Sequence, residues 1–125
     1  TEFLAYDIHQ PRVDFLNAFF ALAYPFAHAI HQDILVTPPA QPADCAFFFK
    51  EAHRFEKRAP GCNRVFFQAL PVKLFIVSLP TEDLRRHHSL VSYHTQLIQE
   101  AVAGLPWGIE QTQVGNELIF FIHKQ

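Results

Sequence analysis

The stretch from Arg64 to Leu79 constrains the fold more than any other part of the chain. It is the most apolar part and is rich in aromatic and β-branched residues, which fit the buried surface of a pleated sheet. Its short length and Lys73 exclude a membrane-spanning helix. Pro71 interrupts the run because proline has no N–H to donate to a strand ladder. We therefore expect two strands, Val65–Leu70 and Val72–Leu79, in the middle of a sheet.

The composition indicates one folded domain. Of 125 residues, 50% are hydrophobic and 18% are charged, a balance that disordered chains lack. The fourteen phenylalanines carry much apolar area, which we expect partly in the core and partly at an interface. The net charge of −2 gives no support for nucleic-acid binding by the chain as a whole.

Cys45 and Cys62 form neither a disulfide framework nor a metal-binding spacing. We expect two reduced thiols, as in a cytoplasmic protein, with one disulfide as the alternative. The sequence has no signal peptide and no transmembrane run, so we predict a cytoplasmic location. A removed leader is left open, because the chain starts at Thr1 and contains no methionine.

The first third of the chain is typical of a helix. Glu2–His9 is predicted as a short strand or an extended lead-in, and Pro11 suits the first turn of a helix. Apolar residues then recur at steps of three and four, which predicts a helix from Arg12 to about His31. Pro25 lies inside this pattern, so we expect a kink there.

Residues 37–42 contain three prolines and predict a stiff connector between the N-terminal helix and the sheet. We expect a single domain over residues 1–125, because the first third alone could not bury its apolar stripe. The following segment, Asp44–Ala59, fits either a helix with Asp44 as its N-cap or a strand. We favour the strand, since Ala46–Phe49 is strongly β-prone, and Pro60–Asn63 would then turn into the next strand.

The last part of the chain predicts a long helix and a hairpin. Thr81 is a good N-cap for a helix that runs to Ala103, and Gly104 is placed to stop it. Two strands follow, Trp107–Gln113 and Glu117–His123, with Gly-Asn between them as a tight turn.

The predicted fold class is α+β, with an antiparallel sheet of about five strands packed by two long helices. The order is roughly α-β-β-β-α-β-β. In topology alone this order resembles small secretion-chaperone-like domains. Folds of this size that leave a sheet edge uncovered often dimerise, so we expect a homodimer.

Histidine pairs are the first candidates for chemistry. On a helix, His28 and His31 would share one face and could approach a single metal ion. A metal site needs at least a third ligand, so these two residues are weak candidates and we predict no metal. The alternative is the polar, solvated face of an amphipathic helix.

A second candidate is a partner-binding or anion-binding patch. Two arginines near a helix N-terminus oppose the helix dipole, and breaking a local preference can mark a site. The alternative is that nearby acidic residues balance the arginines on a solvated surface. The candidate residues of this patch are Arg85, Arg86, His87 and His94.

The third candidate is the basic middle of the chain, with Lys50, Arg54 and Arg58 as binding residues. Aromatic side chains among basic ones can stack nucleic-acid bases. On a strand, however, the phenylalanines would point away from most of these charges. A solvated sheet face or an acidic protein partner is therefore favoured, and nucleic acid is predicted to be unlikely.

The sequence contains no phosphate-cradling glycine loop, zinc-protease histidine motif or serine elbow, and it predicts no cofactor. The leading hypothesis is a non-catalytic adaptor or chaperone-like regulatory module that binds protein and forms a homodimer. The alternative is a small-ligand protein or small enzyme with a pocket lined by histidine and arginine. Single-stranded nucleic-acid binding through residues 50–64 is the third hypothesis.

Overall fold

The computed structural model describes residues 1–83, 85 and 88–124. The chain divides into two compact units, Thr1–Pro39 and Ala40–Gln125. The boundary lies within the proline-rich segment at residues 37–42. A single domain over the whole chain stays a prediction.

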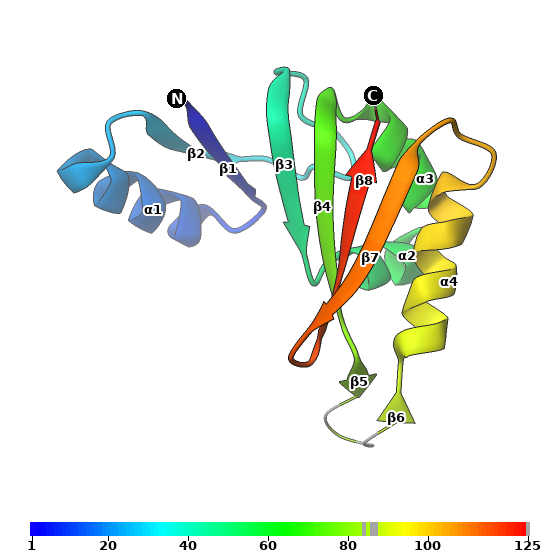
Figure 1. The fold of residues 1–125 in the computed structure, drawn as a ribbon. Helices are drawn as coiled ribbons and strands as arrows, with labels where there is room; N and C mark the ends of the chain where they lie inside the picture. The colour runs from blue at the N-terminus through cyan, green and yellow to red at the C-terminus, as the bar shows by residue number, and fades with distance from the viewer. Residues whose placement is uncertain (84, 86–87, 125) are drawn as a thin grey trace. The chain divides into compact units, whose positions relative to one another are not determined.

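The first unit is a strand, a helix and a second strand, with the two strands parallel. Their register runs from Phe3 opposite Ala27 to Asp7 opposite His31. The bounds are β1 Phe3–Asp7, α1 Gln10–Ala23 and β2 Ala27–His31 (Figure 1). Proline in the first turn of α1 is confirmed.

The prediction of one kinked helix up to about His31 is wrong. The helix α1 ends at Ala23, since a proline at position 25 removes a helical hydrogen bond and clashes with the preceding turn. Ala27 and Ala29 are buried on β2. The Asn17 side chain of α1 donates to the Ala29 carbonyl and accepts from the Ala29 N–H, both at 2.9 Å. Its amide therefore replaces a strand partner at this edge of β2.

The second unit is built on a mixed sheet with the order β3-β4-β8-β7. β3 and β4 are parallel, and the other neighbours are antiparallel. This corrects the predicted antiparallel sheet of about five strands. Its strands are β3 Ala43–Phe49, β4 Val72–Pro80, β7 Gly108–Val114 and β8 Glu117–His123.

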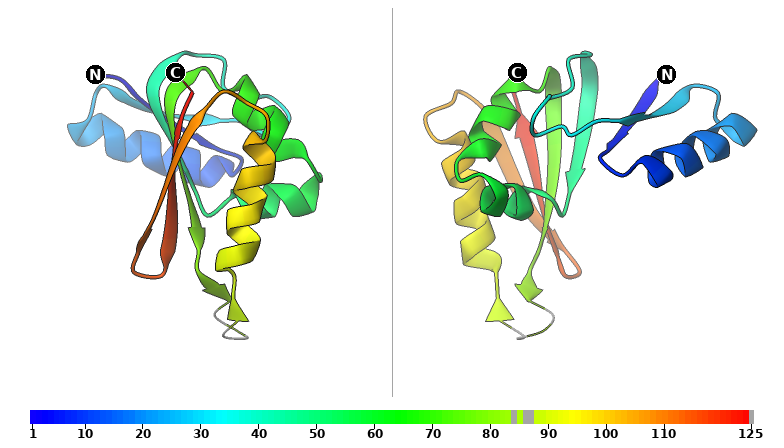
Figure 2. Two further views of the ribbon diagram at one scale, coloured as in Figure 1. Left: turned by 45° about the vertical axis from the view of Figure 1, so that its right-hand side comes forward. Right: turned by 180° about the vertical axis from the view of Figure 1, so that it is seen from behind.

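Three helices cover one face of this sheet (Figures 1 and 2). Two of them, α2 and α3, connect the parallel strands β3 and β4, because parallel neighbours need a crossover. The strand Val65–Leu70 is therefore a wrong prediction, and only the first part of Asp44–Ala59 is a strand. The helices are α2 Ala52–Arg58, α3 Cys62–Ala69 and α4 Val91–Val102.

Phenylalanine rings join these helices to the sheet. Phe48 of β3 contacts the rings of Phe55, Phe66 and Phe75 at centroid distances of 5.0 to 5.8 Å. Phe67 of α3 is fully buried. Each such ring contributes about 1.5–3 kcal/mol to the free energy of unfolding when it is buried. The apolar stretch Arg64–Leu79 therefore forms the core, with its first part in the helix α3 and its second part in the strand β4.

The predicted helix from Thr81 begins ten residues later, at Val91. The segment before it contains a short antiparallel pair, β5 Glu82–Asp83 and β6 His88–Ser89. Thr81 is not an N-cap, because its hydroxyl donates to the Asn116 carbonyl at 3.1 Å. The end before Gly104 and the closing hairpin are confirmed.

Two further findings concern the thiols and membranes. Cys45 and Cys62 are both free thiols. Among the helices of the described residues, none is long and apolar enough to cross a membrane.

Candidate functional site at the carboxyl ends of the parallel strands

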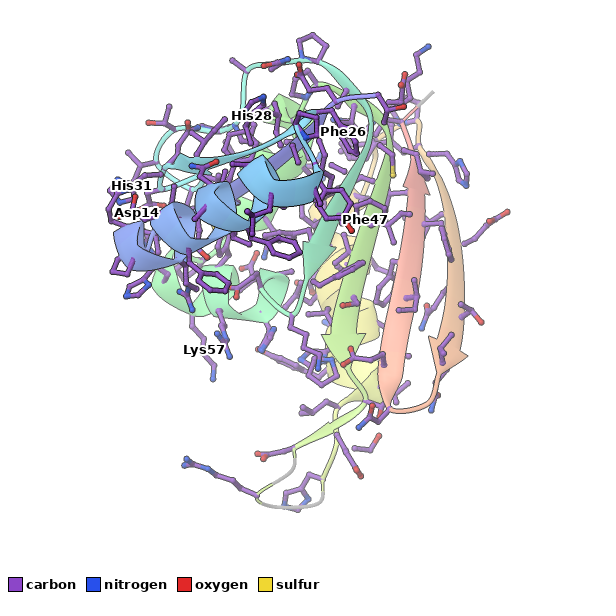
Figure 3. All side chains as sticks on the ribbon, turned by 90° about the vertical axis from the view of Figure 1, so that its left-hand side faces the viewer. Asp14, Phe26, His28, His31, Phe47 and Lys57 are labelled. Atoms are coloured by element: carbon purple, nitrogen blue, oxygen red, sulfur yellow. The ribbon has the colours of Figure 1, made fainter. Side chains whose placement is uncertain are left out.

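Open α/β sheets bind ligands beyond the carboxyl ends of their parallel strands. In the second unit, the parallel strands end at Phe49 and Pro80, and their arrowheads point to the same end of the sheet in Figure 3. Lys50 follows the first strand and Thr81 follows the second. This end of the sheet is therefore where we look for the site.

Lys50 has a left-handed backbone, with φ of 60°, and no other non-glycine residue of the described chain has a positive φ. Its N–H donates to the Ser78 carbonyl of β4 at 2.9 Å, which fixes this conformation. Such a conformation costs of the order of 1–3 kcal/mol and is often found where function requires it. The strain therefore marks the end of β3 as a candidate functional position.

The Lys50 ammonium makes an ion pair across the sheet. Its Nζ lies 2.7 Å from Oε1 of Glu117, the first residue of β8. Lys50 exposes 62% of its side chain and Glu117 exposes 20%. Oε2 of Glu117 is buried and has no hydrogen-bond donor among the residues that the structure describes. The carboxylate is thus fixed in the protein, while the ammonium reaches solvent.

The segment after β4 is fixed at its base. The N–H and the hydroxyl of Thr81 both donate to the Asn116 carbonyl, at 2.9 and 3.1 Å. The Leu90 N–H donates to the Thr81 carbonyl at 2.8 Å. The β5–β6 hairpin therefore extends from a pinned base at the carboxyl end of β4, where Figure 1 shows it beyond the sheet.

A buried histidine supports the same base. His94 of α4 is only 2% exposed, and its Nδ1 lies 2.8 Å from the Pro80 carbonyl. A carbonyl only accepts hydrogen bonds, so Nδ1 is the donor. The His94 ring packs on the ring of His53 at the start of α2, with 5.3 Å between centroids. Burial lowers the pKa of both imidazoles, so both are neutral near pH 7.

The predicted site residues are spread over this region. Lys50 and His94 lie at the carboxyl ends of β3 and β4, and Arg85 is exposed on the hairpin segment. Arg54 is exposed on α2, 3.6 Å from Glu51, and Arg58 is exposed in its last turn. Arg86 and His87 lie outside the described residues.

In the second unit, sequence reasoning missed three residues of the site: His53, Asn116 and Glu117. Asn116 and Glu117 were seen only as parts of a hairpin, because their partners Thr81 and Lys50 are distant in the sequence. His53 stood in a segment predicted as a strand. A signal for Glu117 was present, since it is an acidic residue at the start of a strand that is otherwise apolar.

In the first unit, Asp7 stands at the carboxyl end of β1. Its Oδ2 lies 3.1 Å from Nε of Arg12, and its Oδ1 accepts from the His9 N–H at 2.7 Å. The Gln32 N–H donates to the Asp7 carbonyl at 3.0 Å, which ties the ends of both strands together. Asp7 is therefore held in place at the carboxyl end of β1, beside the end of β2.

His28 and His31 lie on strand β2 and not on a helix (Figure 3). Residues three apart on a strand point to opposite faces. His31 instead places Nε2 2.9 Å from the Ile8 carbonyl. Within the described residues, no three histidine, cysteine or acidic side chains are grouped to hold a metal ion.

A hollow of about 800 Å³ lies at the opposite, amino end of β4. Lys124 and Trp107 line it, and the Lys124 ammonium lies 4.9 Å from the indole ring. The same ammonium donates to the carbonyls of Phe67 and Leu70 at the end of α3. These contacts stabilise a helix end, so the size of the hollow does not make it the site.

Comparisons with known proteins identify the family of the chain. The family model described as ribosomal RNA methyltransferase (FmrO) matches residues 1–122. A 16S rRNA (guanine(1405)-N(7))-methyltransferase from Serratia marcescens is 31% identical over 123 residues, covering 94% of this chain and 47% of that protein. The enzyme of the same name from Micromonospora rosea is 24% identical over 125 residues, covering 99% and 46%.

Solved structures give the same fold. An rRNA methylase from Escherichia coli has a TM-score of 0.83 and 27% identity, covering 99% of this chain and 49% of that one. The 16S rRNA methyltransferase RmtF, in complex with S-adenosyl-L-homocysteine, has a TM-score of 0.85 at 22% identity, covering 98% and 47%, and shows the fold alone. The chain spans about half the length of the curated relatives it matches.

These matches correct the functional predictions. A family of ribosomal RNA methyltransferases contradicts a non-catalytic, regulatory protein-binding module, and it contradicts the prediction that nucleic acid is an unlikely partner. The methyltransferase fold also replaces the chaperone-like topology. The predicted homodimer is not tested by one chain. From the match over residues 1–122, the chain belongs to the FmrO family of ribosomal RNA methyltransferases.

Proposed function

We propose that the protein containing this chain transfers a methyl group from S-adenosylmethionine to N7 of a guanine in 16S rRNA. The names of its relatives give the reaction and the substrate. The observation that carries the proposal within this chain is the strained Lys50, paired with Glu117 at the carboxyl ends of the parallel strands. An rRNA substrate also supports a cytoplasmic location.

The residues of the first unit fit the proposed cofactor. The Asp7 side chain exposes 27% of its surface beside Arg12. A carboxylate offers about four acceptor positions, so the ion pair and the His9 N–H leave it able to accept ribose hydroxyls. When bound, S-adenosylmethionine supplies an electrophilic methyl group on a sulfonium. In this proposal Asp7 binds and orients the ribose.

The residues of the second unit fit a reaction that needs positioning more than proton transfer. Guanine N7 carries a free lone pair in the plane of the base, so no general base is required. Lysine ammonium groups bind the O6 and N7 edge of guanine in known nucleic-acid contacts. We assign Lys50 to the O6 acceptor, with Glu117 fixing the direction of its ammonium.

Basic side chains around the site are suited to rRNA phosphates. Arg85 is exposed on the hairpin segment, and Arg54 and Arg58 are exposed on α2. Lys57 of α2 also points away from the sheet in Figure 3. Contacts to phosphates give affinity and register without reading sequence, so replacing these residues should weaken binding and lower its salt dependence.

The test measures transfer of labelled methyl from S-adenosylmethionine to purified small ribosomal subunits, with mapping of N7-methylguanine in the 16S rRNA. The protein should label one guanine, and Lys50→Ala should reduce the rate by about 100-fold, as for loss of one positioned donor. Lys73→Ala is the matched control, because Lys73 is an exposed lysine near the amino end of the neighbouring strand β4. No label from a folded protein would reject the function, and equal rates for the two variants would reject the site.

A further inference from the structure

We propose that His94, together with His53, is a positioning residue that holds the β5–β6 hairpin in its working orientation only while both imidazoles are neutral. The histidine clamp consists of these two rings and the Pro80 carbonyl. The inference rests on the proposed function, because the hairpin is assigned there to the rRNA substrate. It adds a condition on that site, since the hydrogen bonds between β5 and β6 should open more often in mild acid.

The geometry of the clamp joins three elements. The His94 ring, on α4, donates to the last carbonyl of β4 at 2.8 Å. The His53 ring, in the first turn of α2, packs on it at 5.3 Å and 52°. His94 is 2% exposed, so its imidazole ring is shielded from water. The clamp therefore fixes Pro80, and Thr81 with the hairpin base follows directly in the chain.

The clamp also reaches the strained end of β3. His53 lies three residues after Lys50, and the N–H of Arg54 donates to the Glu51 carbonyl at 2.9 Å in the turn that starts α2. Movement of α2 away from α4 would therefore act on the Lys50 backbone as well as on the hairpin. The contact between the two rings therefore adds to the hydrogen bonds that already hold Lys50 and Thr81 at the carboxyl ends of the parallel pair.

The surroundings disfavour a proton on either ring. The groups that face them are the cations Arg54 and Lys57 from α2, the phenol of Tyr93 from α4 and the Pro80 carbonyl from β4. Nδ1 of His53 is buried and has no partner in the described part of the chain. A protonated pair would place two like charges in contact beside the cations of Arg54 and Lys57, so protonation should separate the rings.

The experiment follows hydrogen exchange of the hairpin segments β5 and β6 in the full protein without substrate, at pH 7.5 and pH 5.5. After correction for intrinsic rates, we expect exchange to be about tenfold faster at the lower pH in the wild type. His94→Gln keeps a donor for the Pro80 carbonyl but cannot titrate, so its exchange should be slow at both values. His94→Leu has no donor, so its exchange should be fast at both.

His88→Gln is the matched control, since His88 is exposed on β6 and lies outside the clamp. It should keep the wild-type dependence on pH. Wild-type exchange that does not change with pH, or a His94→Gln protein that keeps the full dependence, would overturn the inference. The comparison of wild type with His94→Gln decides the question even if His94→Leu does not fold.

Methylation kinetics then connect the clamp to function. Because N7 needs no deprotonation, the wild-type KM for ribosomal subunits should rise between pH 7.5 and pH 6 while kcat changes little. The dependence should disappear in His94→Gln. A dependence on pH that lies in kcat and persists in His94→Gln would reject the positioning role. Absence of methylation would reject the proposed function, whereas the exchange measurement would still test the clamp.

Discussion

Two lysines at opposite ends of the same sheet show how differently one residue type can be used. Lys124 lies at the amino end of β4, where its ammonium donates to two carbonyls of α3 and packs on Trp107. Lys50 lies at the carboxyl end on a left-handed backbone, with most of its side chain exposed. Burial lowers the pKa of Lys124. The hydrogen bonds to the two carbonyls account for a lysine at this partly buried position.

The difference between the two lysines separates stability from function. The contacts of Lys124 satisfy carbonyls that a helix end leaves unpaired, so they stabilise the fold. The contacts of Lys50 hold its backbone in a strained, left-handed conformation and leave its ammonium group exposed. A strained, exposed residue is a better indication of a site than a large hollow, and here the hollow belongs to Lys124.

The largest expected effect on stability comes from Lys124→Met. It leaves the Phe67 and Leu70 carbonyls without their donor and removes the contact with Trp107. We expect a loss of about 2 kcal/mol in the free energy of unfolding, measured by urea denaturation. Methylation per folded molecule should stay within about twofold, since the site is at the other end of the sheet. A large loss of kcat at full folding would show that the two ends are not separate.

The next effect is on activity, in Glu117→Gln. The variant keeps the shape of the side chain but removes the charge that fixes the Lys50 ammonium. We expect about a tenfold loss of kcat/KM, because an unheld donor is less well oriented. Glu110→Gln is the control, as Glu110 is an exposed acid on the neighbouring strand β7. Equal activity of Glu117→Gln and Glu110→Gln would contradict a role for Glu117 in the site.

A smaller effect should separate strain from charge at position 50. Both Lys50→Ala and Lys50→Gly lose the ammonium, but only glycine accepts a φ of 60° without steric cost. Lys50→Gly should therefore be more stable than Lys50→Ala by about 1 kcal/mol, measured by thermal denaturation, while both lose about 100-fold in methylation rate. Equal stability would mean that the left-handed backbone stores no strain.

The smallest expected effect is the pH dependence of stability. The pKa values of His53 and His94 are lowered in the folded protein by burial. The unfolded chain therefore binds more protons below about pH 6.5, so stability is full above that pH and falls as the pH decreases. Melting temperatures of the wild type and of His53→Gln/His94→Gln should diverge below pH 6.5. If the two melting temperatures changed in parallel with pH, the two imidazoles would have the same pKa values in the folded and the unfolded chain.

Local signals in the sequence predicted several elements correctly. A run rich in aromatic and β-branched residues predicted β4, and Gly-Asn between two β-prone runs predicted the β7–β8 hairpin. Pro11 placed the start of α1. Each of these depends on the conformation of a few neighbouring residues, which a sequence pattern reports directly.

Other elements depended on neighbours that the sequence does not show. The phenylalanines of Cys62–Ala69 fit a strand or a buried helix equally well, and the parallel pairing of β3 with β4 required the helix as a crossover. Threonine is a good N-cap residue, but the hydroxyl of Thr81 donates its hydrogen bond to the Asn116 carbonyl instead. A tertiary hydrogen bond thus overrode a local preference.

By itself the sequence determined the apolar strands, the closing hairpin and the basic character of residues 50–64, because these follow from local chemistry. Only the tertiary structure placed Lys50 opposite Glu117 and His53 against His94. Both pairs join residues that are distant in the chain and meet only when the parallel strands end side by side. A site made at the ends of strands is assembled by the sheet, so its residues carry no spacing that a sequence could reveal.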